Sequence, residues 1–454
     1  MEKHSGIIDT VLLLDNYGEE SRMLYLSFRR AGFDGPVIVL MDDGFLPDDV
    51  ISIYQYFCGN YTENSDVPGR ARYFNQINVP DYWEISGNNT GGKIHNLNKE
   101  RGRIFYAEPL HKRLVKTVDW MEESGTVRAS DHYNKYGALY AKTAFNKKGQ
   151  KFCKSYFDSD GKEVLMENYV TSDIILNRDG KVFLYKNKTQ LALKLLEEIG
   201  ALNSRLFYNS LSTPLFLSER MPDTRTEDVL FWQEDERNDI PGNMQMIFDG
   251  KSKRTKNIYV QKEDSYAKLI SLGAPADMVK PLGFAYEFDK ENGYENNALI
   301  CTNSDMIERC VEIIELLPDM YFHIAAITEM SSKLLSLSKY ENVTLYPAAK
   351  TKHIEKLFDI CDFYLDINHG NEIMSAVKTA FLHNHLIAGF SKTTHNKRYI
   401  AAEHIFDDYQ ALVDFLKSVM NDTLKISNHI KLQKDAAMAE NPSEYAKLLN
   451  NSFL

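Results

Sequence analysis

A short polar loop between two apolar runs carries the side chains of this chain that are best suited to bind a ligand. An apolar run at residues 363–367 leads into the loop, and an amphipathic run and a second apolar run, 386–388, follow it. Amide, imidazole and carboxylate groups form hydrogen bonds with sugar hydroxyls and with peptide backbone. In an α/β domain such a loop lies beyond the carboxyl end of a parallel strand, where these folds bind ligands. The sequence therefore predicts a binding loop whose polar members are Asn368, His369, Asn371 and Glu372.

Other polar and aromatic residues also follow apolar runs, and we assign them to the same cleft as a hypothesis. They are Asn16, Tyr17, Trp232, Glu234 and Asn303. Trp232 is either a core residue or an aromatic platform at the cleft. His369 and Asn371 have an alternative too, because they could cap the helix that follows them.

A cluster of basic residues in the middle of the chain is a candidate contact surface. Its members are Lys99, Arg101, Arg103, Lys112 and Arg113. A solvated surface is the simplest interpretation. The more specific alternative is contact with a partner subunit. We adopt it as a hypothesis for Arg101, Arg103, Lys112 and Arg113. An anionic membrane surface would attract the same charges.

The elements that must position these residues alternate between strand and helix at both ends of the chain. Residues 9–16, 19–32 and 36–41 read as strand, helix and strand, a parallel βαβ opening. A helix at 189–201 and strands at 204–209, 228–234 and 256–261 follow later. After a polar stretch, 287–297, expected to be a linker, a second α/β series runs through strands near 298, 321, 343 and 363 and helices around 306–317 and 353–361.

The middle of the chain has a different pattern, in which strand-like runs alternate with polar turns. Glycines mark four of these turns, at positions 125, 149, 161 and 180. The Asp160-Gly161 and Asp179-Gly180 pairs predict type I′ hairpins, in which both central residues need φ > 0. We therefore expect an extended antiparallel meander inserted into the first α/β domain. The predicted domains are 1–69 and 188–286 (Rossmann-like domain I), 70–187 (inserted β-sheet) and 287–454 (Rossmann-like domain II with C-terminal helices).

Composition excludes several classes of protein. The chain has 454 residues, 43% of them hydrophobic, which fits a multidomain globular protein. Its formal charge of −11 argues against a general nucleic-acid binder. The five cysteines are scattered without a CxxC pair, so we expect reduced thiols, no metal site and no cofactor. The first ten residues lack a signal-peptide layout and no apolar run is long enough to span a membrane, so we expect a cytoplasmic protein.

Two facing nucleotide-type α/β domains are the plan of GT-B glycosyltransferases, and several long motifs make the resemblance more specific. These are DDGFLPDDVISIY at 42–54, YFNQINVPDYWEISGNN at 73–89, FYNSLSTPLFLS at 207–218, FWQE at 231–234 with IPGNMQ at 240–245, and DINHGNEI at 366–373. Over about residues 9–435 the chain resembles the stabilising, GtfB-type subunit of the O-GlcNAc transferase that modifies serine-rich-repeat adhesins in the accessory Sec system of Gram-positive bacteria. In that family the β-meander is the inserted domain. The GtfA-type partner binds UDP-GlcNAc, and the GtfB-type subunit holds the acceptor polypeptide.

The resemblance also indicates which catalytic residues are missing. Retaining GT-B enzymes of the nearest class use two glutamates separated by seven residues, and an arginine–lysine pair that neutralises the diphosphate leaving group. Here Glu372 is followed at the second position by Ala380, and the other register gives Gly370 and Lys378. The basic pair is replaced by the segment 302–305 (Thr, Asn, Ser, Asp), and Arg309 lies well past the turn.

The sequence therefore predicts a non-catalytic subunit. It would form a hetero-oligomer with a GtfA-type transferase through the β-domain, stabilise it, and bind the Ser/Thr-rich adhesin acceptor in the former sugar cleft. Peripheral contact with the cytoplasmic face of the cell membrane is a further expectation from the family. Two alternatives stay open at this point: an active GT-B enzyme, with a teichoic-acid or protein acceptor and a diverged site, and a structural scaffold that never touches substrate.

Overall fold

The chain forms two compact units, each built around a parallel sheet. The computed structural model describes residues 8–59, 69–223 and 227–450. Unit 1 comprises Met1–Pro281 and Ser443–Leu454, and unit 2 comprises Leu282–Pro442. Within the described residues, no helix is both long and apolar enough to cross a membrane. The fold is mixed α/β, with two parallel sheets and one antiparallel sheet, as the sequence patterns predicted.

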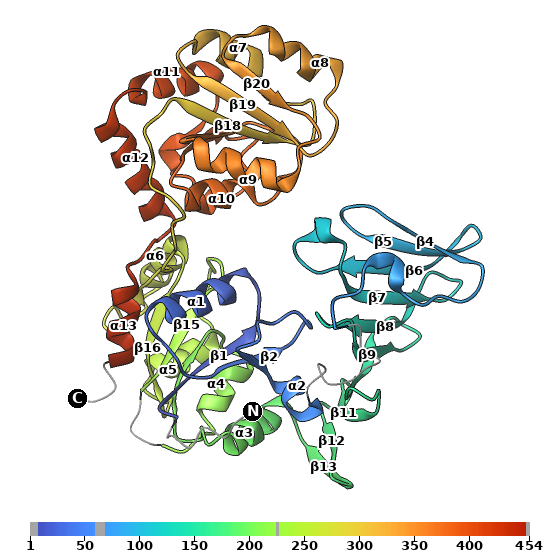
Figure 1. The fold of residues 1–454 in the computed structure, drawn as a ribbon. Helices are drawn as coiled ribbons and strands as arrows, with labels where there is room; N and C mark the ends of the chain where they lie inside the picture. Colours follow the sequence, from blue (N-terminus) through green and yellow to red (C-terminus); the bar gives the residue numbers. More distant parts are fainter. Residues whose placement is uncertain (1–7, 60–68, 224–226, 451–454) are drawn as a thin grey trace. The chain divides into compact units, whose positions relative to one another are not determined.

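Unit 1 contains a seven-stranded parallel sheet in the order β17-β16-β15-β14-β1-β2-β3 (Figure 1). Its strands are β1 (Thr10–Asn16), β2 (Val37–Met41), β3 (Val50–Ser52), β14 (Arg205–Tyr208), β15 (Asp228–Trp232), β16 (Thr255–Val260) and β17 (Val279–Pro281). Its helices are α1 (Glu19–Arg30), α2 (Ile53–Cys58), α3 (Lys188–Glu198), α4 (Thr213–Ser218), α5 (Gly242–Phe248), α6 (Glu263–Ser271) and α13 (Pro442–Asn450). Tyr445 of α13 is fully buried against Phe28 of α1, with ring centroids 5.1 Å apart, so α13 packs back onto this part of unit 1.

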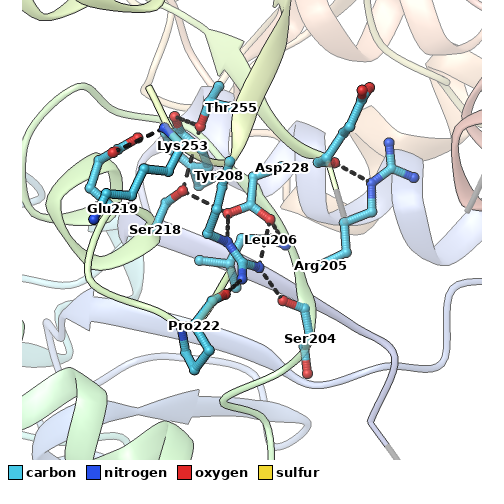
Figure 2. Close-up of polar contacts among 12 residues, drawn as sticks. Ser204, Arg205, Leu206, Tyr208, Ser218, Glu219, Pro222, Asp228, Lys253 and Thr255 are labelled. Carbon is cyan, nitrogen blue, oxygen red and sulfur yellow. Dashed lines mark hydrogen bonds and ion pairs between the residues drawn. The ribbon is translucent and has the colours of Figure 1, made fainter. Parts of the chain in front are cut away.

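A buried ion pair joins the amino-terminal ends of the central strands of unit 1 (Figure 2). Asp228 begins β15 and is fully buried, and Arg254, which precedes β16, is 1% exposed. Arg254 donates to the carboxylate through Nε (2.8 Å) and Nη2 (3.0 Å). The carboxylate also accepts from Leu206 N at 2.8 Å and Ser218 Oγ at 2.6 Å. A buried charge pair is tolerated only when its remaining hydrogen-bonding capacity is satisfied, as it is here.

The second sheet of unit 1 is a ten-stranded antiparallel meander that runs in sequence order from β4 to β13 (Figure 1). Its strands are β4 (Trp83–Gly87), β5 (Gly92–Asn96), β6 (Lys99–Tyr106), β7 (Val115–Met121), β8 (Val127–Tyr133), β9 (Leu139–Phe145), β10 (Lys151–Phe157), β11 (Glu163–Asn168), β12 (Ile174–Arg178) and β13 (Lys181–Tyr185). This antiparallel sheet packs against helix α2. The rings of Tyr54 in α2 and Tyr156 in β10 stack with their centroids 4.1 Å apart.

One of the two type I′ turns expected from Asp-Gly pairs is confirmed and the other is wrong. Asp179 and Gly180 have φ of +53° and +71° and link the directly paired Arg178 and Lys181. At the other pair only Gly161 has a positive φ, +75°. There Gly161 N donates to Asp158 O, and Asp158 N to the carbonyl of residue 162, which makes a longer loop. A three-residue loop of this kind needs φ > 0 at one position, and glycine supplies it.

Unit 2 contains a six-stranded parallel sheet in the order β20-β19-β18-β21-β22-β23. Its strands are β18 (Asn297–Thr302), β19 (Tyr321–Ala326), β20 (Val343–Tyr346), β21 (Phe363–Asp366), β22 (Leu386–Phe390) and β23 (Ile405–Phe406). Its helices are α7 (Cys310–Leu316), α8 (Ser332–Leu335), α9 (Thr351–Ile360), α10 (Ala376–Leu382), α11 (Tyr409–Val419) and α12 (Thr423–Ala436). The helix expected around 306–317 starts only at Cys310, because Arg309 has a φ of +49°.

The polar stretch 287–297, which the sequence predicted to be a linker, is instead part of unit 2 and packs within it. The Asn292 side chain is 6% exposed and donates to the carbonyls of Asp362 (2.9 Å) and Asn384 (2.8 Å). The Asp362 carboxylate accepts from Gly293 N at 2.9 Å and from Lys290 Nζ at 2.8 Å. Polar residues suggested solvent exposure, but here Asn292 forms hydrogen bonds with backbone carbonyls just before β21 and β22.

Candidate functional site

The predicted binding loop lies at the carboxyl end of β21, at the centre of the sheet of unit 2, as the sequence predicted. We call residues 367–375 the β21 loop. Its first residues are joined to the segment after β18 by an antiparallel bridge between Ile307 and Asn368. Glu308 N donates to Ile367 O and His369 N to Met306 O, both at 2.8 Å. The loops that follow two adjacent strands are therefore held together by backbone hydrogen bonds.

Asn368 and Asn303 form the inner part of the site. Asn368 is 3% exposed, and its Oδ1 lies 2.8 Å from the hydroxyl of Thr302, which can donate to it. Asn303 lies against the loop so closely that a Cβ on Gly370 would come within 2.1 Å of its Oδ1. The structure thus brings Asn303 and the β21 loop together, and glycine at position 370 permits the close approach.

His369 forms a hydrogen bond with an acidic side chain at the surface of the site. Its Nε2 lies 2.7 Å from Glu308 Oε2, and Lys392 Nζ lies 2.8 Å from the other oxygen of the same carboxylate. The hydrogen bonds from His369 and Lys392 hold the pKa of Glu308 below its usual range. Arg309, the basic residue past the turn after β18, donates from Nη1 to Glu312 Oε1 at 2.9 Å. The cations Lys392 and Arg309 are thus paired with the carboxylates of Glu308 and Glu312, an arrangement that does not favour a diphosphate.

The alternative in which His369 and Asn371 cap the following helix is wrong. Helix α10 begins at Ala376, and the position before it is Ser375. Glu372 provides the contact instead, because its Oε1 accepts a hydrogen bond from Val377 N at 2.9 Å. Asn371 is exposed and lies outside the helix. The β21 loop is therefore longer than expected and presents Asn371 to solvent.

A histidine that the sequence analysis missed completes the site. His395 follows β22, and its ring Nδ1 lies 2.7 Å from Asp366 Oδ1 while Nε2 lies 2.7 Å from Gly370 O. The hydrogen bond with Asp366 raises the pKa of His395 to about 9, against the opposing effect of partial burial. The available signal was its position, since polar residues after neighbouring parallel strands converge at one edge of the sheet.

The site residues predicted in unit 1 do not form one cluster. Asn16 Oδ1 accepts from Gly18 N at 2.9 Å and so shapes the turn after β1. Tyr17 packs edge-on against Tyr25, with ring centroids 6.0 Å apart, and burial raises its pKa. Glu234 is exposed and lies 3.4 Å from Arg237. It lines an open hollow of about 430 Å³ formed by Glu20, Gln233, Glu234, Asp235, Glu236, Arg237 and Lys262.

The interpretation of Trp232 as an aromatic platform is wrong. Trp232 is 2% exposed and belongs to the hydrophobic core of unit 1. The next residue, Gln233, carries the polar contacts at this strand end, with bonds to Asn209 (2.9 Å) and Gln261 (2.7 Å). The last residue of a strand can point either way, and the alternation of strand side chains placed Trp232 inward.

The basic cluster of the antiparallel sheet is largely paired with acidic residues. Arg103 lies 2.6 Å from Glu100, and Arg101 lies 3.7 Å from Glu123. Arg113 donates to Asn89 Oδ1 at 2.8 Å, and Lys112 is exposed. The cluster therefore presents basic side chains on a surface whose charge is partly offset by acidic neighbours.

No group of three or more histidine, cysteine or acidic residues that could hold a metal ion occurs among residues 8–59, 69–223 and 227–450. All five cysteines are free thiols, and four of them are buried.

Comparisons with known proteins agree with this layout. Family models match the chain in four blocks: the GtfB N-terminal domain at 11–57, the GtfB middle domain at 83–186, the GtfB third domain at 188–272 and the GftB/GlyA-F C-terminal domain at 298–433. A UDP-N-acetylglucosamine–peptide N-acetylglucosaminyltransferase stabilizing protein GtfB of Streptococcus agalactiae is 39% identical over 97% of this chain and 98% of its own length. Its counterpart in Streptococcus pneumoniae serotype 4 is 41% identical over 90% and 92%.

Solved structures give the same result. A chain in the crystal structure of a GtfA/B complex bound to UDP and GlcNAc is 38% identical, with a TM-score of 0.89 over 98% of this chain and 100% of that one. A chain in the structure of accessory secretory protein 1, 2 and 3 of Streptococcus pneumoniae is 12% identical, with a TM-score of 0.58 over 97% and 98%. At that identity the second likeness concerns the fold alone.

Proposed function

The chain belongs to the family of GtfB-type stabilizing proteins of UDP-GlcNAc–peptide GlcNAc transferases, and on that premise we propose that it stabilises a GtfA-type catalytic partner and binds the polypeptide that this partner glycosylates. The family assignment confirms the resemblance inferred from the motifs. Complex formation is supported by the 38% identity to a chain of a GtfA/B complex over almost the whole length.

We propose that the chain does not itself transfer sugar. The observation that carries this proposal is that the charged side chains in and beside the β21 loop already bond to other groups of the protein. Glu372 Oε1 accepts from the start of α10, and the nearby cations Lys392 and Arg309 lie against Glu308 and Glu312. A transferase site needs cations directed at the developing charge of the leaving diphosphate. The loop instead offers amide and imidazole groups, which suit neutral hydroxyls and peptide backbone.

The acceptor that fits this chemistry is a Ser/Thr-rich polypeptide, either bare or already bearing GlcNAc. We propose the serine-rich-repeat adhesin of the accessory Sec system as that polypeptide. Holding the acceptor beside the catalytic partner would raise the effective concentration of its hydroxyls at the partner's site, with no chemical step on this chain.

A pair of variants tests acceptor binding. Asn371→Ala with Glu372→Gln removes two groups of the β21 loop while retaining a hydrogen-bonding group at position 372. The control is Glu341→Gln, an exposed residue before β20 at the other end of the sheet. With fluorescent adhesin-repeat peptides we expect the double variant to bind about tenfold or more weakly, the equivalent of one or two hydrogen bonds. Unchanged peptide binding by a folded, partner-bound double variant would overturn the site assignment.

Sugar-nucleotide binding distinguishes this proposal from an active GT-B enzyme. Calorimetry of UDP-GlcNAc and UDP-glucose with the isolated chain is expected to show no heat of binding. Saturable binding of either nucleotide would favour the enzyme, and failure of the chain to retain any Ser-rich peptide would favour the pure scaffold.

We propose that the catalytic partner contacts the antiparallel sheet, including Arg101, Arg103, Lys112 and Arg113. Charge reversal of the exposed Lys112 together with Arg103 should lower the amount of partner that co-purifies. Lys147→Glu, in a turn of the same sheet, is the matched control. Equal recovery of partner with both variants would remove these residues from the interface.

The cellular and domain-level expectations stand as proposals that accompany this function. We propose a cytoplasmic protein with peripheral contact at the cytoplasmic face of the membrane, which fractionation and vesicle flotation of the complex would test. The GT-B arrangement with a cleft between two Rossmann-like domains, and the division at residues 69, 187 and 286, stay predictions. Small-angle scattering and limited proteolysis of the full chain would check them.

A further inference from the structure

His395 is attached at three points to the strand and loop that carry the proposed acceptor site. Its backbone N donates to Asp366 Oδ2 and its ring Nδ1 lies 2.7 Å from Asp366 Oδ1. Its ring Nε2 lies 2.7 Å from the carbonyl oxygen of Gly370. Asp366 is the last residue of β21 and its side chain is 1% exposed, whereas Gly370 is in the middle of the β21 loop. The ring therefore connects the rigid sheet to the loop.

The two ring contacts define the state of the imidazole. A carboxylate and a backbone carbonyl can only accept hydrogen bonds, so both ring nitrogens must donate. That requires the doubly protonated, positively charged ring. The charge also compensates the buried carboxylate of Asp366, which would otherwise lose the favourable solvation it has in water.

The β21 loop has a backbone conformation that needs such support. Met374 and Ser375, which precede α10, have φ of +52° and +49°, a region that residues other than glycine rarely adopt. Two consecutive residues of this kind carry strain, and such strain persists where the surrounding contacts hold the segment in place. Side-chain hydrogen bonds that tie the later part of the loop to its surroundings include those of Glu372 with Val377 N of α10 and of His395 with Gly370 O.

We propose that His395 is a positioning residue for the acceptor site: its charged ring holds the Gly370 carbonyl against the end of β21 and thereby sets the direction in which Asn371 and Glu372 meet the acceptor. This inference rests on the proposed function for its consequence in binding. Its structural part, the control of loop order by the ring, does not depend on what the loop binds.

Deprotonation of the ring should release the loop before it releases the strand. A neutral imidazole keeps one N–H, and the charged carboxylate of Asp366 competes for it better than a carbonyl does. The charged groups that act on the ring are Asp366 on β21 and Glu372 in the loop, and both favour the protonated form. The raised pKa means that the contribution of the charged ring is complete below about pH 6.5 and is lost as the pH rises through about 9.

The test compares three variants of the full chain co-purified with its catalytic partner. His395→Gln removes the charge, and His395→Arg keeps a cation with several donors. His353→Gln, on the exposed face of α9, is the matched control. Hydrogen exchange is followed in peptides covering 367–375, expressed as protection relative to the intrinsic rate at each pH. Binding of an adhesin-repeat peptide is titrated from pH 7 to 10.

We expect His395→Gln to lose at least about tenfold in both loop protection and peptide affinity at pH 7, while partner co-purification is unchanged. His395→Arg should restore part of both, and only the wild type and His353→Gln should lose loop protection as the pH passes 9. Loop protection that is equal in His395→Gln and wild type, or independent of pH up to 10 in the wild type, overturns the inference. The wild-type pH series decides the matter even if a variant fails to fold.

The two proposals fail in different ways. If the loop loses protection in His395→Gln but the repeat peptide binds equally well to every variant, including Asn371→Ala with Glu372→Gln, the acceptor assignment is wrong and the positioning of the loop by His395 stands. If the double variant loses peptide binding and His395→Gln does not, the acceptor site stands and the positioning role is wrong.

Discussion

Replacement of Asp228 by asparagine is expected to destabilise unit 1 by about 3–5 kcal/mol, the range measured when one partner of a buried ion pair is removed. The structure supports the upper part of that range. Asparagine is isosteric, so the Arg254 guanidinium stays buried, but the negative charge that compensates it is lost. The carboxylate accepts four hydrogen bonds, from Arg254 Nε and Nη2, Leu206 N and Ser218 Oγ. In asparagine an amide nitrogen replaces one of the carboxylate oxygens. Its N–H groups would then point at neighbouring N–H or O–H groups, which also donate and cannot accept.

Urea unfolding followed by tryptophan fluorescence measures this change. The three tryptophans, Trp83, Trp120 and Trp232, are all in unit 1, so their emission reports on that unit. The control is Glu444→Gln, which breaks the more exposed pair with Lys447 on α13 and should change stability by no more than about 1 kcal/mol.

The paired replacement Asp228→Leu with Arg254→Met sharpens the test. It removes both charges, so we expect it to cost less than Asp228→Asn alone, because no uncompensated charge is left in the core. A cost below about 1 kcal/mol for Asp228→Asn, or a double variant less stable than the single one, would refute the assignment of the network as a charge-compensated core element.

Three further outcomes follow from burial, backbone geometry and protonation. Trp232→Ala should lower the free energy of unfolding in urea by about 3–5 kcal/mol because the ring fills the core. The affinity of the folded variant for the repeat peptide should not change. A loss of affinity without loss of stability would restore the platform interpretation. Gly180→Ala, at a φ of +71°, should lower the stability of unit 1 by about 1 kcal/mol. Gly242→Ala, in helix α5 with open space around it, should not lower it. Equal effects of the two variants in urea unfolding would contradict the type I′ geometry. Burial, helped by nearby lysines, lowers the pKa of His132 to about 3, so its neutral ring contributes stability above pH 6.5 that is lost as the pH falls toward 3. His132→Gln should flatten the dependence of the unit 1 melting temperature on pH in that window, and an unchanged slope would exclude the histidine as its source.

The position of the β21 loop could be predicted because it depends on the local pattern of apolar and polar residues. The apolar run of β21, the polar residues after it and the next apolar run place Asn368 to Glu372 at the carboxyl end of a parallel strand in any α/β arrangement. Asn303, which follows the adjacent strand β18, lies against this loop, and its part in binding stays a prediction. The family could be inferred from the sequence motifs because these motifs are long and specific. The comparisons confirmed this family.

The errors arise where a side chain had two local alternatives. Trp232 ends a strand, and a strand end can direct its side chain into the core or toward the ligand edge. His369 and Asn371 had the right residue types for a helix cap, but α10 starts after two residues with positive φ, and Glu372 reaches its first turn. Nothing in residue type alone reports such a backbone path, because neither Met374 nor Ser375 is a residue that favours it.

The sequence by itself determined the strand and helix series, the inserted antiparallel sheet, the position of the β21 loop and the family of the protein. These follow from periodicities and motifs that extend over a few to a few tens of neighbouring residues. Only the tertiary structure decided which charges are already engaged and what holds the loop. His395 is 29 residues from Asp366 and 25 from Gly370, and Arg254 is 26 residues from Asp228. Such partners are chosen by the order of strands in the sheet, a long-range property that local patterns do not specify.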